Sequence, residues 1–286
     1  EAIDELGLRP EELALEEMAV RVFSAMSAQS RLYHTMDHVL EVAEGGDAVH
    51  LLAAVFHDVV YIEADEGLPY RLESALEPWV SGEGSKIVLA EEAPGGEEWF
   101  PLACMVFGVS GPAHFCTHPG RNEFLSAIAA GIFLGPYLDS RSLVAIFSCI
   151  EATIPFRPNG PDEDAWYREL GVRLQRIDRD ASLGIGAAGC DAMVARAVAL
   201  ANRDMGSFAH EDPNVFFLHT WQLLAEGKSI LSHPGLYSLG EYQRALQERC
   251  RFLLGLDATR IFSSFSARYA NINFVRRAVS KPAAAT

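Results

Sequence analysis

Histidines and an aspartate recur at short spacing in the first quarter of the chain. His34 and His38 are four residues apart, so on a helix both side chains would project from nearly the same side. His57 and Asp58 follow within the apolar segment LLAAVFHDVVY. An ionised carboxylate is very costly to bury in such surroundings unless a cation or dedicated hydrogen-bond donors compensate its charge. A divalent metal held by His57, Asp58 and a histidine of the preceding helix would provide that compensation.

The same residues admit a simpler interpretation. A single buried His-Asp pair is more often a hydrogen-bonded pair of the core than a metal site. Here three histidines and an aspartate recur on two adjacent predicted helices, which favours the metal. Imidazole and carboxylate ligands suit Mn²⁺, Fe²⁺, Co²⁺, Ni²⁺ or Zn²⁺ better than Ca²⁺. We therefore predict a divalent transition metal of this group as the cofactor.

The elements that must position these side chains are predicted to be helices. Apolar residues recur at spacings of three and four along most of the chain, and the alternation typical of strands is almost absent. Segments rich in glycine and proline separate the periodic runs. The sequence thus predicts an all-α fold with helices over residues 11–29, 35–45, 48–61, 67–82, 97–109, 121–134, 139–153, 163–178, 190–204, 213–226, 239–254 and 258–275.

The order of these motifs resembles the HD superfamily of metal-dependent phosphohydrolases. The pattern YH-xxx-H at 33–38, FHD-xx-Y at 56–61 and the later ESA at 73–75 are similar to predicted HD phosphohydrolases with a Y-H-N-x-x-H motif. The resemblance covers about residues 20–185. It implies an HD-domain helical bundle, here with additional C-terminal helices, a centre of one or two metal ions, and hydrolysis of phosphate esters or nucleotides.

The resemblance also implies which residues hold the metal. The first ligand in the family pattern is the histidine that precedes the apolar residues VLEVA, hence His38, and His57 and Asp58 follow. His34 would be an added ligand or a group that transfers protons or contacts phosphate. A later aspartate completes the set in this family. The segment IDRDASLG at 177–184 is similar to the family's closing stretch, with Asp178 and Asp180 as candidates, and we favour Asp180.

Further polar residues are predicted to support the reaction. Glu73 is a candidate acid, base or positioning carboxylate, although a solvated helix face would also explain it. The family often has a histidine after the stretch that reads IEAT here at 150–153, and this chain has none; Arg157 is predicted to contact phosphate instead. His114 and His118 could form a second metal site or belong to a loop, because Pro119-Gly120 breaks the helix after them.

The chain is predicted to form one helical domain over residues 1–286. Its motif-bearing core spans about 20–185, and a helical cover spans about 186–278. Within that cover, Asn202, Arg203 and Asp204 fall late in a helix and could reach the pocket, and a helix-end ion pair explains them equally well.

The composition restricts the classes of molecule that the protein is expected to bind. The formal net charge is −16, so the surface repels nucleic acids and anionic membranes, and a phosphate-bearing ligand needs a metal or a local basic pocket. The longest apolar stretches are shorter than the roughly 20 residues of a membrane helix. Five cysteines without CxxC spacing are typical of reduced thiols in a cytoplasmic protein. We expect a small phosphorylated substrate, and no nucleic-acid or membrane partner.

The favoured function is that of a metal-dependent phosphohydrolase or phosphodiesterase that attacks a nucleotide or another small phosphate ester with a metal-activated water. In this scheme His34, Asp58, Glu73 and Arg157 serve catalysis. Two alternatives stay open. A di-iron oxygenase of the HD fold would need extra histidine ligands and would depend on His114 and His118. A degenerate HD domain would bind a nucleotide or a protein without catalysis.

Overall fold

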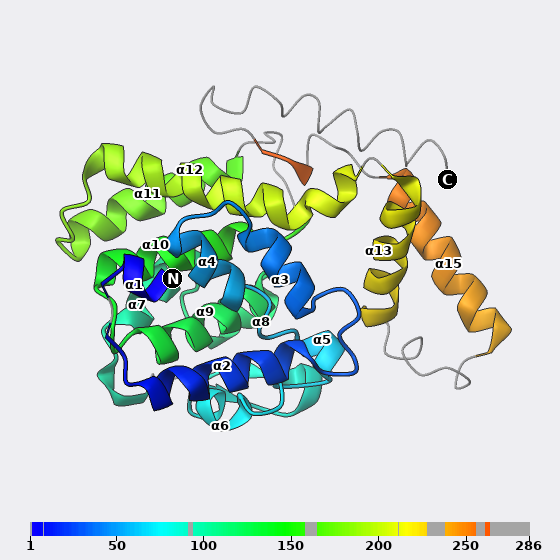
Figure 1. Ribbon diagram of the computed structural model, residues 1–286, viewed down its shortest axis with the longest axis horizontal. Coiled ribbons are helices and arrows are strands. Elements are labelled where there is room, and N and C mark those ends of the chain that lie inside the picture. The colour runs from blue at the N-terminus through cyan, green and yellow to red at the C-terminus, as the bar shows by residue number, and fades with distance from the viewer. Residues whose placement is uncertain are drawn as a thin grey trace.

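The computed structural model describes residues 2–7, 9–90, 94–157, 165–210, 212–227, 238–255 and 261–263. Within these residues the fold is built from helices (Figure 1). The strands assigned in the described residues are limited to one antiparallel pair. Strands β1 (Val80–Ser81) and β2 (Val88–Leu89) pair with Val80 opposite Leu89. The prediction of an all-α fold is confirmed.

The longer helices agree with the predicted ranges to within a few residues. Short 3₁₀ turns, η1 (Glu77–Trp79), η2 (Gly84–Lys86), η3 (Pro94–Gly96) and η4 (Met205–Ala209), connect some of them. In chain order the α-helices are α1 (Ala2–Glu5), α2 (Glu12–Met26), α3 (Met36–Ala43), α4 (Ala48–Phe56), α5 (Ile62–Asp65), α6 (Glu73–Leu76), α7 (Trp99–Phe107), α8 (Pro112–Thr117), α9 (Arg121–Leu134), α10 (Ser140–Ala152), α11 (Ala165–Asp180), α12 (Gly186–Asp204), α13 (Pro213–Glu226) and α15 (Leu239–Leu254).

Two predicted helices need separate comment. The helix predicted over 67–82 is wrong, because only the single turn of α6 forms there, followed by η1 and β1. Pro78 lacks an N–H and its ring excludes a continuing helix, and Arg71 adopts a left-handed conformation with φ of 67° just before α6. The helix predicted over 258–275 falls outside the described residues except for 261–263.

Helix α10 lies at the centre of the bundle, packed against α4, α7, α9 and α12 (Figure 1). Its residues from Leu143 to Ala152 are all buried. A helix that is apolar on every side must be surrounded by other elements. Its buried polar side chains have partners, since the Ser148 hydroxyl donates to the carbonyl of Val144 at 2.6 Å and the Glu151 carboxylate pairs with Arg157 and Arg173. At its start, Asp139 caps the first turn by accepting from the N–H of Ser142.

Helix α12 is joined firmly to α4. Asp47 caps α4 by accepting from the N–H of His50, and its other oxygen accepts two hydrogen bonds from Arg196 of α12, at 2.9 and 2.8 Å. The imidazole of His50 contacts the carbonyl of Arg196 at 3.1 Å. One buried apolar cluster runs from Ala2 to Ala201. Helix α12 is therefore part of the main core, and not of a cover that begins at residue 186.

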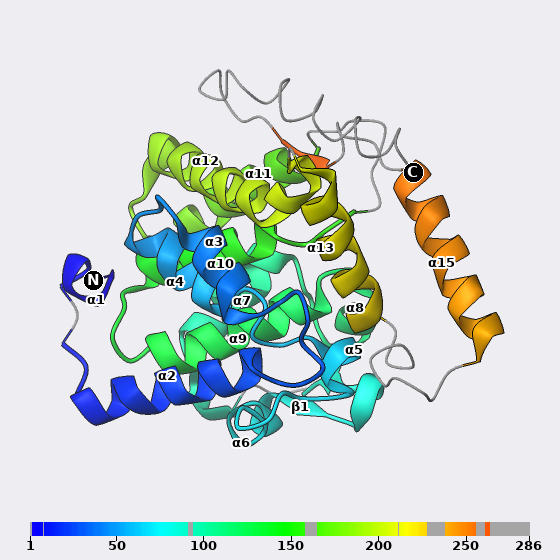
Figure 2. The ribbon, with the colours of Figure 1, turned by 45° about the vertical axis from the view of Figure 1, so that its right-hand side comes forward.

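Helices α13 and α15 stand together at one side of the molecule, beside α3 and α5 (Figures 1 and 2). They share a second, smaller apolar cluster with η4 and residues 261–262, formed by Phe208, Phe216, Leu253, Ile261 and Phe262. None of the helices in the described residues is both long and apolar enough to cross a membrane.

Close packing of α9 against α7 gives a test of this arrangement. A Cβ added to Gly131 in α9 would lie 2.3 Å from Cε3 of Trp99, so Gly131→Ala should destabilise the protein by about 1–3 kcal/mol. Gly171 in α11 is the matched control, because its added Cβ would meet Val194 at an ordinary 3.6 Å. Gly171→Ala should be neutral or stabilising by up to about 1 kcal/mol. Urea denaturation measures the free energy of unfolding of both variants. Equal changes in the two variants would contradict the close packing of α9 against α7.

Candidate metal centre

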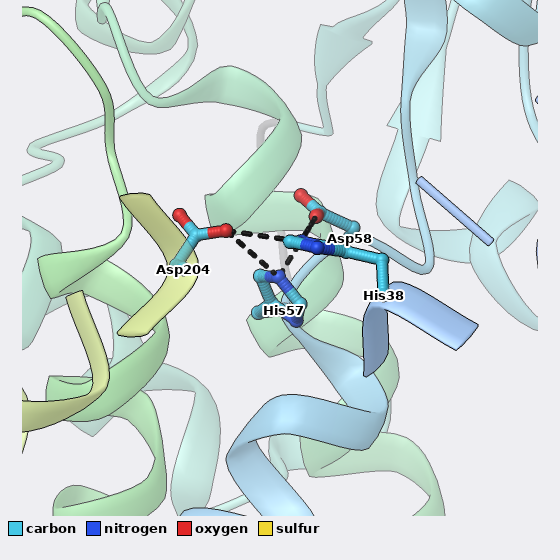
Figure 3. Close-up of side chains that lie close together, drawn as sticks. All are labelled: His38, His57, Asp58 and Asp204. Carbon is cyan, nitrogen blue, oxygen red and sulfur yellow. Dashed lines mark hydrogen bonds and ion pairs between the residues drawn. The ribbon is translucent and has the colours of Figure 1, made fainter. Parts of the chain in front are cut away.

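Four side chains from three helices converge on one point in the interior. His38 belongs to α3, His57 and Asp58 follow the last residue of α4, and Asp204 is the last residue of α12. One ligand atom of each lies within 4.8 Å of all the others, a spacing that a single metal ion can bridge (Figure 3). No second group of this kind occurs in the described part of the chain.

Imidazole nitrogens and carboxylate oxygens alternate around this point. Nε2 of His57 lies 2.8 Å from Oδ2 of Asp58 and 3.5 Å from Oδ1 of Asp204. Nε2 of His38 lies 3.1 Å from the same Asp204 oxygen and 3.7 Å from the Asp58 oxygen. Two neutral nitrogen donors and two anionic oxygens form a ligand set that suits a divalent transition metal.

The second nitrogen of His57 sets the orientation of its ring. Nδ1 lies 2.7 Å from the carbonyl oxygen of Ala54, which can only accept, so Nδ1 carries a proton. In the neutral ring Nε2 then presents its lone pair to the cluster, as in many metal-bound histidines. Nε2 of His57 and Oδ2 of Asp58 are buried, and neither makes a hydrogen bond of normal geometry. A cation bound by both atoms would satisfy both, so the residues fit a metal.

The electrostatics of the cluster also require a positive charge. Burial opposes ionisation of Asp58, but the neighbouring His57, His34 and His38 outweigh it and hold the pKa of the Asp58 carboxyl well below its usual range. Burial likewise opposes protonation of His57, and Asp58 and Asp204 outweigh it, so the pKa of His57 rises well above its usual value. In the metal-free cluster a proton on imidazole balances the carboxylates. Metal binding would displace that proton.

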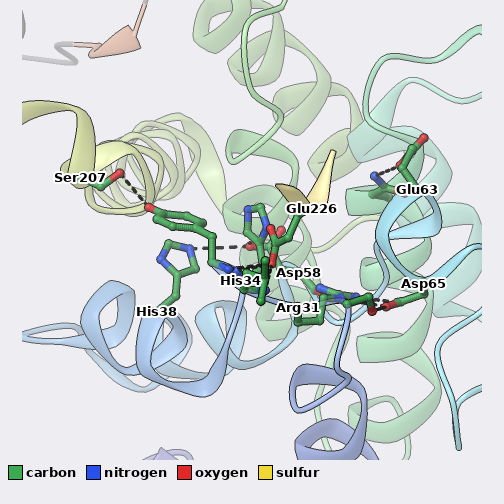
Figure 4. A network of polar contacts seen from close by, with 12 residues as sticks. Arg31, His34, His38, Asp58, Glu63, Asp65, Ser207 and Glu226 are labelled. Carbon is green, nitrogen blue, oxygen red and sulfur yellow. Dashed lines mark hydrogen bonds and ion pairs between the residues drawn. The ribbon is translucent and has the colours of Figure 1, made fainter. Parts of the chain in front are cut away.

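Glu226, in the last turn of α13, holds the loop that precedes α3. Its Oε1 accepts from the backbone N–H groups of Leu32, Tyr33 and His34 at 2.5, 2.8 and 3.0 Å, and its Oε2 lies 2.6 Å from Nδ1 of the His34 ring (Figure 4). Glu226 is almost fully buried. A C-terminal helix therefore positions residues beside the cluster. The sequence carried no signal for this role, because a glutamate near a helix end usually faces solvent.

The side chains around the loop enclose the cluster. The ring of His34 lies beside Asp58, with Nε2 3.8 Å from Oδ2, and packs edge-on against Tyr61. The ring of Tyr33 packs at a tilt on His38, and its hydroxyl donates to Ser207 at 2.8 Å (Figure 4). His34 is thus adjacent to the four converging residues and outside them.

Arg31 carries a charge that could contact a phosphate, but its guanidinium is engaged by other residues of the protein. Its guanidinium binds both oxygens of Asp65, at 2.9 and 2.7 Å, and donates to the carbonyl of Asp58 at 2.9 Å (Figure 4). The side chain is buried. Arg31 therefore fixes the backbone of Asp58 and has no free face for a ligand.

The prediction that Asp180 completes the ligand set is wrong, and Asp204 takes that place. Asp180 is exposed at the end of α11, where it pairs with Arg176 at 3.2 Å and Arg179 at 3.0 Å. The carboxylate of Asp178 accepts from two backbone N–H groups at the start of α12, those of Ile185 and Gly186. Helix α11 runs away from the cluster, and α12 returns to it, so the aspartate at the end of α12 reaches the site (Figure 1).

Two predicted catalytic residues also lie elsewhere. Glu73 is exposed on α6 and does not line the cavity next to the cluster. Arg157 is paired with the buried Glu151 at 2.7 Å and stacks over Trp166, outside the lining of that cavity. The carboxylate of Glu151 accounts for this placement, since a buried charge needs a partner of opposite sign.

His114 and His118 do not join the cluster. His118 uses both ring nitrogens for structure: Nδ1 accepts from the N–H of Gly120 at 3.1 Å, and Nε2 lies 3.1 Å from the carbonyl oxygen of Phe107. Nδ1 of His114 contacts Ser110 near the protein surface. The second metal site considered for this pair is therefore absent from the described residues.

A cavity of about 460 Å³ lies next to the cluster. Asp58, His34 and Asp204 form part of its lining, and Phe208 and Phe252 contribute apolar wall from the C-terminal segments. We call this space the cluster cavity. It is large enough for a small organic molecule and brings such a molecule against the candidate metal ligands.

Glu123 contributes a second kind of carboxyl group to the cluster cavity. It lies in the first turn of α9 and is only 8% exposed. Burial raises its pKa to about 8, so the carboxyl group is protonated at neutral pH and can donate a proton. Sequence reasoning missed it because an acid in a first helical turn is usually a solvated partner of the helix dipole.

No protein-family model matches the chain, and searches among curated proteins and solved structures likewise find no significant match.

Separate alanine substitutions of the two candidate aspartates, Asp204 and Asp180, test the cluster directly. Wild type should bind about one divalent ion per chain, and Asp204→Ala should weaken that binding by more than the roughly 10–100-fold expected for loss of an outer-shell partner. Asp180→Ala should bind metal like wild type, because Asp180 pairs with surface arginines. Elemental analysis and competition with a chelator measure both variants. Loss of metal from Asp180→Ala alone would refute the assignment.

The raised pKa of Glu123 predicts a pH-dependent stability in metal-free protein. The folded state holds this proton up to about pH 8, whereas the unfolded chain loses it near pH 4.5. The contribution of Glu123 to the free energy of unfolding is therefore full below pH 4.5 and is lost as the pH rises through 8. Glu123→Gln should match wild type below about pH 4 and exceed it above pH 8 by up to roughly 5 kcal/mol. The control is Glu73→Gln, at an exposed site. Parallel pH curves for wild type and Glu123→Gln would contradict the prediction.

Proposed function

We propose that the protein is a metal-dependent hydrolase of phosphate esters, with nucleotides among its candidate substrates. The observation that carries this proposal is the pair of buried atoms Nε2 of His57 and Oδ2 of Asp58, which lie 2.8 Å apart without a hydrogen bond and converge with His38 and Asp204 beside the cluster cavity. A divalent ion held by these four residues would lower the pKa of water and polarise a phosphoryl oxygen.

The chain's own residues supply the other requirements of hydrolysis. Glu123 lines the cavity, and with its raised pKa it would give its proton to the leaving group. His34 lines the same cavity, held by Glu226, and would contact the phosphate. Phe208, Met205 and Phe252 provide an apolar wall for the rest of the substrate and keep water away from it.

Membership of the HD superfamily is part of the proposal. The ligand order along the chain supports it: one histidine in a first helix, a His-Asp pair after the next, and an aspartate late in a third. Asp204 replaces Asp180 in this scheme. No observation supports the di-iron oxygenase, because His114 and His118 lie apart from the cluster and no second metal group occurs among the described residues.

Turnover of phosphate esters tests the function. Reconstituted with Mn²⁺, Fe²⁺, Co²⁺, Ni²⁺ or Zn²⁺, wild type should hydrolyse at least one member of a panel of nucleotide and non-nucleotide mono- and diesters. His57→Ala should abolish this activity, and Glu123→Gln should lower kcat by roughly 10²–10⁴-fold, the usual contribution of a general acid. His210→Ala is the control, at an exposed histidine outside the cavity lining.

Three outcomes would contradict the hydrolase. Failure to bind metal after reconstitution would leave the cluster as a hydrogen-bonded core of a binding protein. Two irons per chain together with oxygen-dependent turnover would establish the oxygenase. Hydrolysis that survives His57→Ala would place the reaction elsewhere.

A further inference from the structure

Arg249, in the last third of α15, is a half-buried cation whose guanidinium has two buried nitrogen atoms without a hydrogen bond. Its Nε and Nη2 atoms are inaccessible to solvent and make no hydrogen bond, and no ion pair to Arg249 occurs in the described part of the chain. The guanidinium stacks over the ring of Phe252, 4.7 Å from its centre. Arg249 and Phe252 both line the cluster cavity.

Arg249 is positively charged, whereas the other ionisable side chains of that lining are mostly acidic. It is the one arginine or lysine among the described residues that line the cavity, whereas Asp58, Glu63, Glu123 and Asp204 are all carboxylic acids. Two other arginines with low exposure have acidic partners: Arg31 binds Asp65 and Arg157 binds Glu151. None of the cavity's acids is hydrogen-bonded to Arg249.

An unpaired guanidinium in the interior is costly, and its persistence needs a compensating group. Burial lowers the pKa of Arg249 to about 10, which still leaves the side chain charged at neutral pH. The stack on Phe252 holds the planar group in one orientation. A planar fork of N–H donors held in place is complementary to two oxygens of a phosphate or carboxylate.

The position of Arg249 separates it from the cluster. Helix α13 stands between α15 and the helices α3 and α4 in both views of the molecule (Figures 1 and 2). Arg249 and Phe252 contribute the α15 part of the cavity lining, and Asp58 and Asp204 contribute the part that belongs to the cluster.

We propose that Arg249 binds an oxyanion of the substrate, phosphate or carboxylate, that is distinct from the group reacting at the metal cluster. The inference rests on the proposed function in treating the cluster cavity as the substrate site. It adds a substrate class: molecules with a scissile group at one end and a second anionic group at the other. It also makes α15 a determinant of specificity.

Anion binding by metal-free protein tests this residue apart from any catalysis. The probes are inorganic phosphate and succinate, each compared with sodium chloride at equal ionic strength, in calorimetric titrations and thermal unfolding. At least one probe should bind wild type and raise its Tm. Arg249→Met should weaken binding roughly 10–100-fold, the loss expected for a hydrogen bond to a charged group. Arg249→Lys should retain part of it, since an ammonium cannot form the paired contact. The stronger of the two probes identifies the oxyanion.

Arg251 supplies the matched control, because it lies on the same helix and is exposed. Arg251→Met should bind both probes like wild type. Without anion, Arg249→Met should be at least as stable as wild type, since it removes a buried unpaired charge and keeps an apolar stem beside Phe252. Weak binding in a fully folded variant therefore reports the contact itself.

The inference is overturned if neither probe binds wild type, or if Arg249→Met binds them equally well. Its failure is distinguishable from that of the hydrolase. If no ester is hydrolysed but only Arg249→Met loses anion binding, the oxyanion site stands and the proposed chemistry fails. With a hydrolysed substrate in hand, Arg249→Met should raise KM about 10-fold or more and leave kcat nearly unchanged, as expected for binding that is equal in ground and transition states.

Discussion

Two carboxylates, Asp58 and Asp204, lie side by side with side chains only 16% and 11% exposed, and their negative charge has to be balanced largely inside the protein. Little of either side chain reaches solvent, so the balance falls to the imidazoles of His38 and His57 and to whatever cation they help to hold. The surrounding structure meets this requirement. Helices α3, α4 and α12 each bring one part of the cluster, and the Asp47–Arg196 contact fixes α12 against α4.

The polar groups behind the cluster are likewise paired within the protein. Arg31 ties the carbonyl of Asp58 to Asp65, the carbonyl of Ala54 orients His57, and Glu226 gathers three backbone N–H groups and the ring of His34. Each of these charged groups is satisfied by protein. Nε2 of His57 and Oδ2 of Asp58, in contrast, are buried without a hydrogen bond in the cluster beside the cavity, and this is the physical basis for treating the cavity as functional.

The C-terminal segment is more than a cover for the bundle. Through Glu226, helix α13 positions the loop that leads into α3, and through Arg249 and Phe252, helix α15 lines the cavity. A hydrophobic cluster of its own, around Phe208 and Phe216, holds this segment together. Residues that lie more than 150 positions after His38 along the chain therefore share its environment.

Local patterns in the sequence determined the helices and three of the four converging residues. Helical periodicity depends on near neighbours, and His38, His57 and Asp58 combine short spacing with apolar surroundings that only a buried charge site explains. Asp204 could not be chosen over Asp180 in this way. The choice depends on α11 running away from the site and α12 returning to it, which is a matter of how the helices pack. Glu123, Glu226 and Arg249 look like ordinary surface charges in sequence, and only the tertiary structure gives them a role: Glu123 and Arg249 line the cluster cavity, and the buried Glu226 holds the loop beside the cluster.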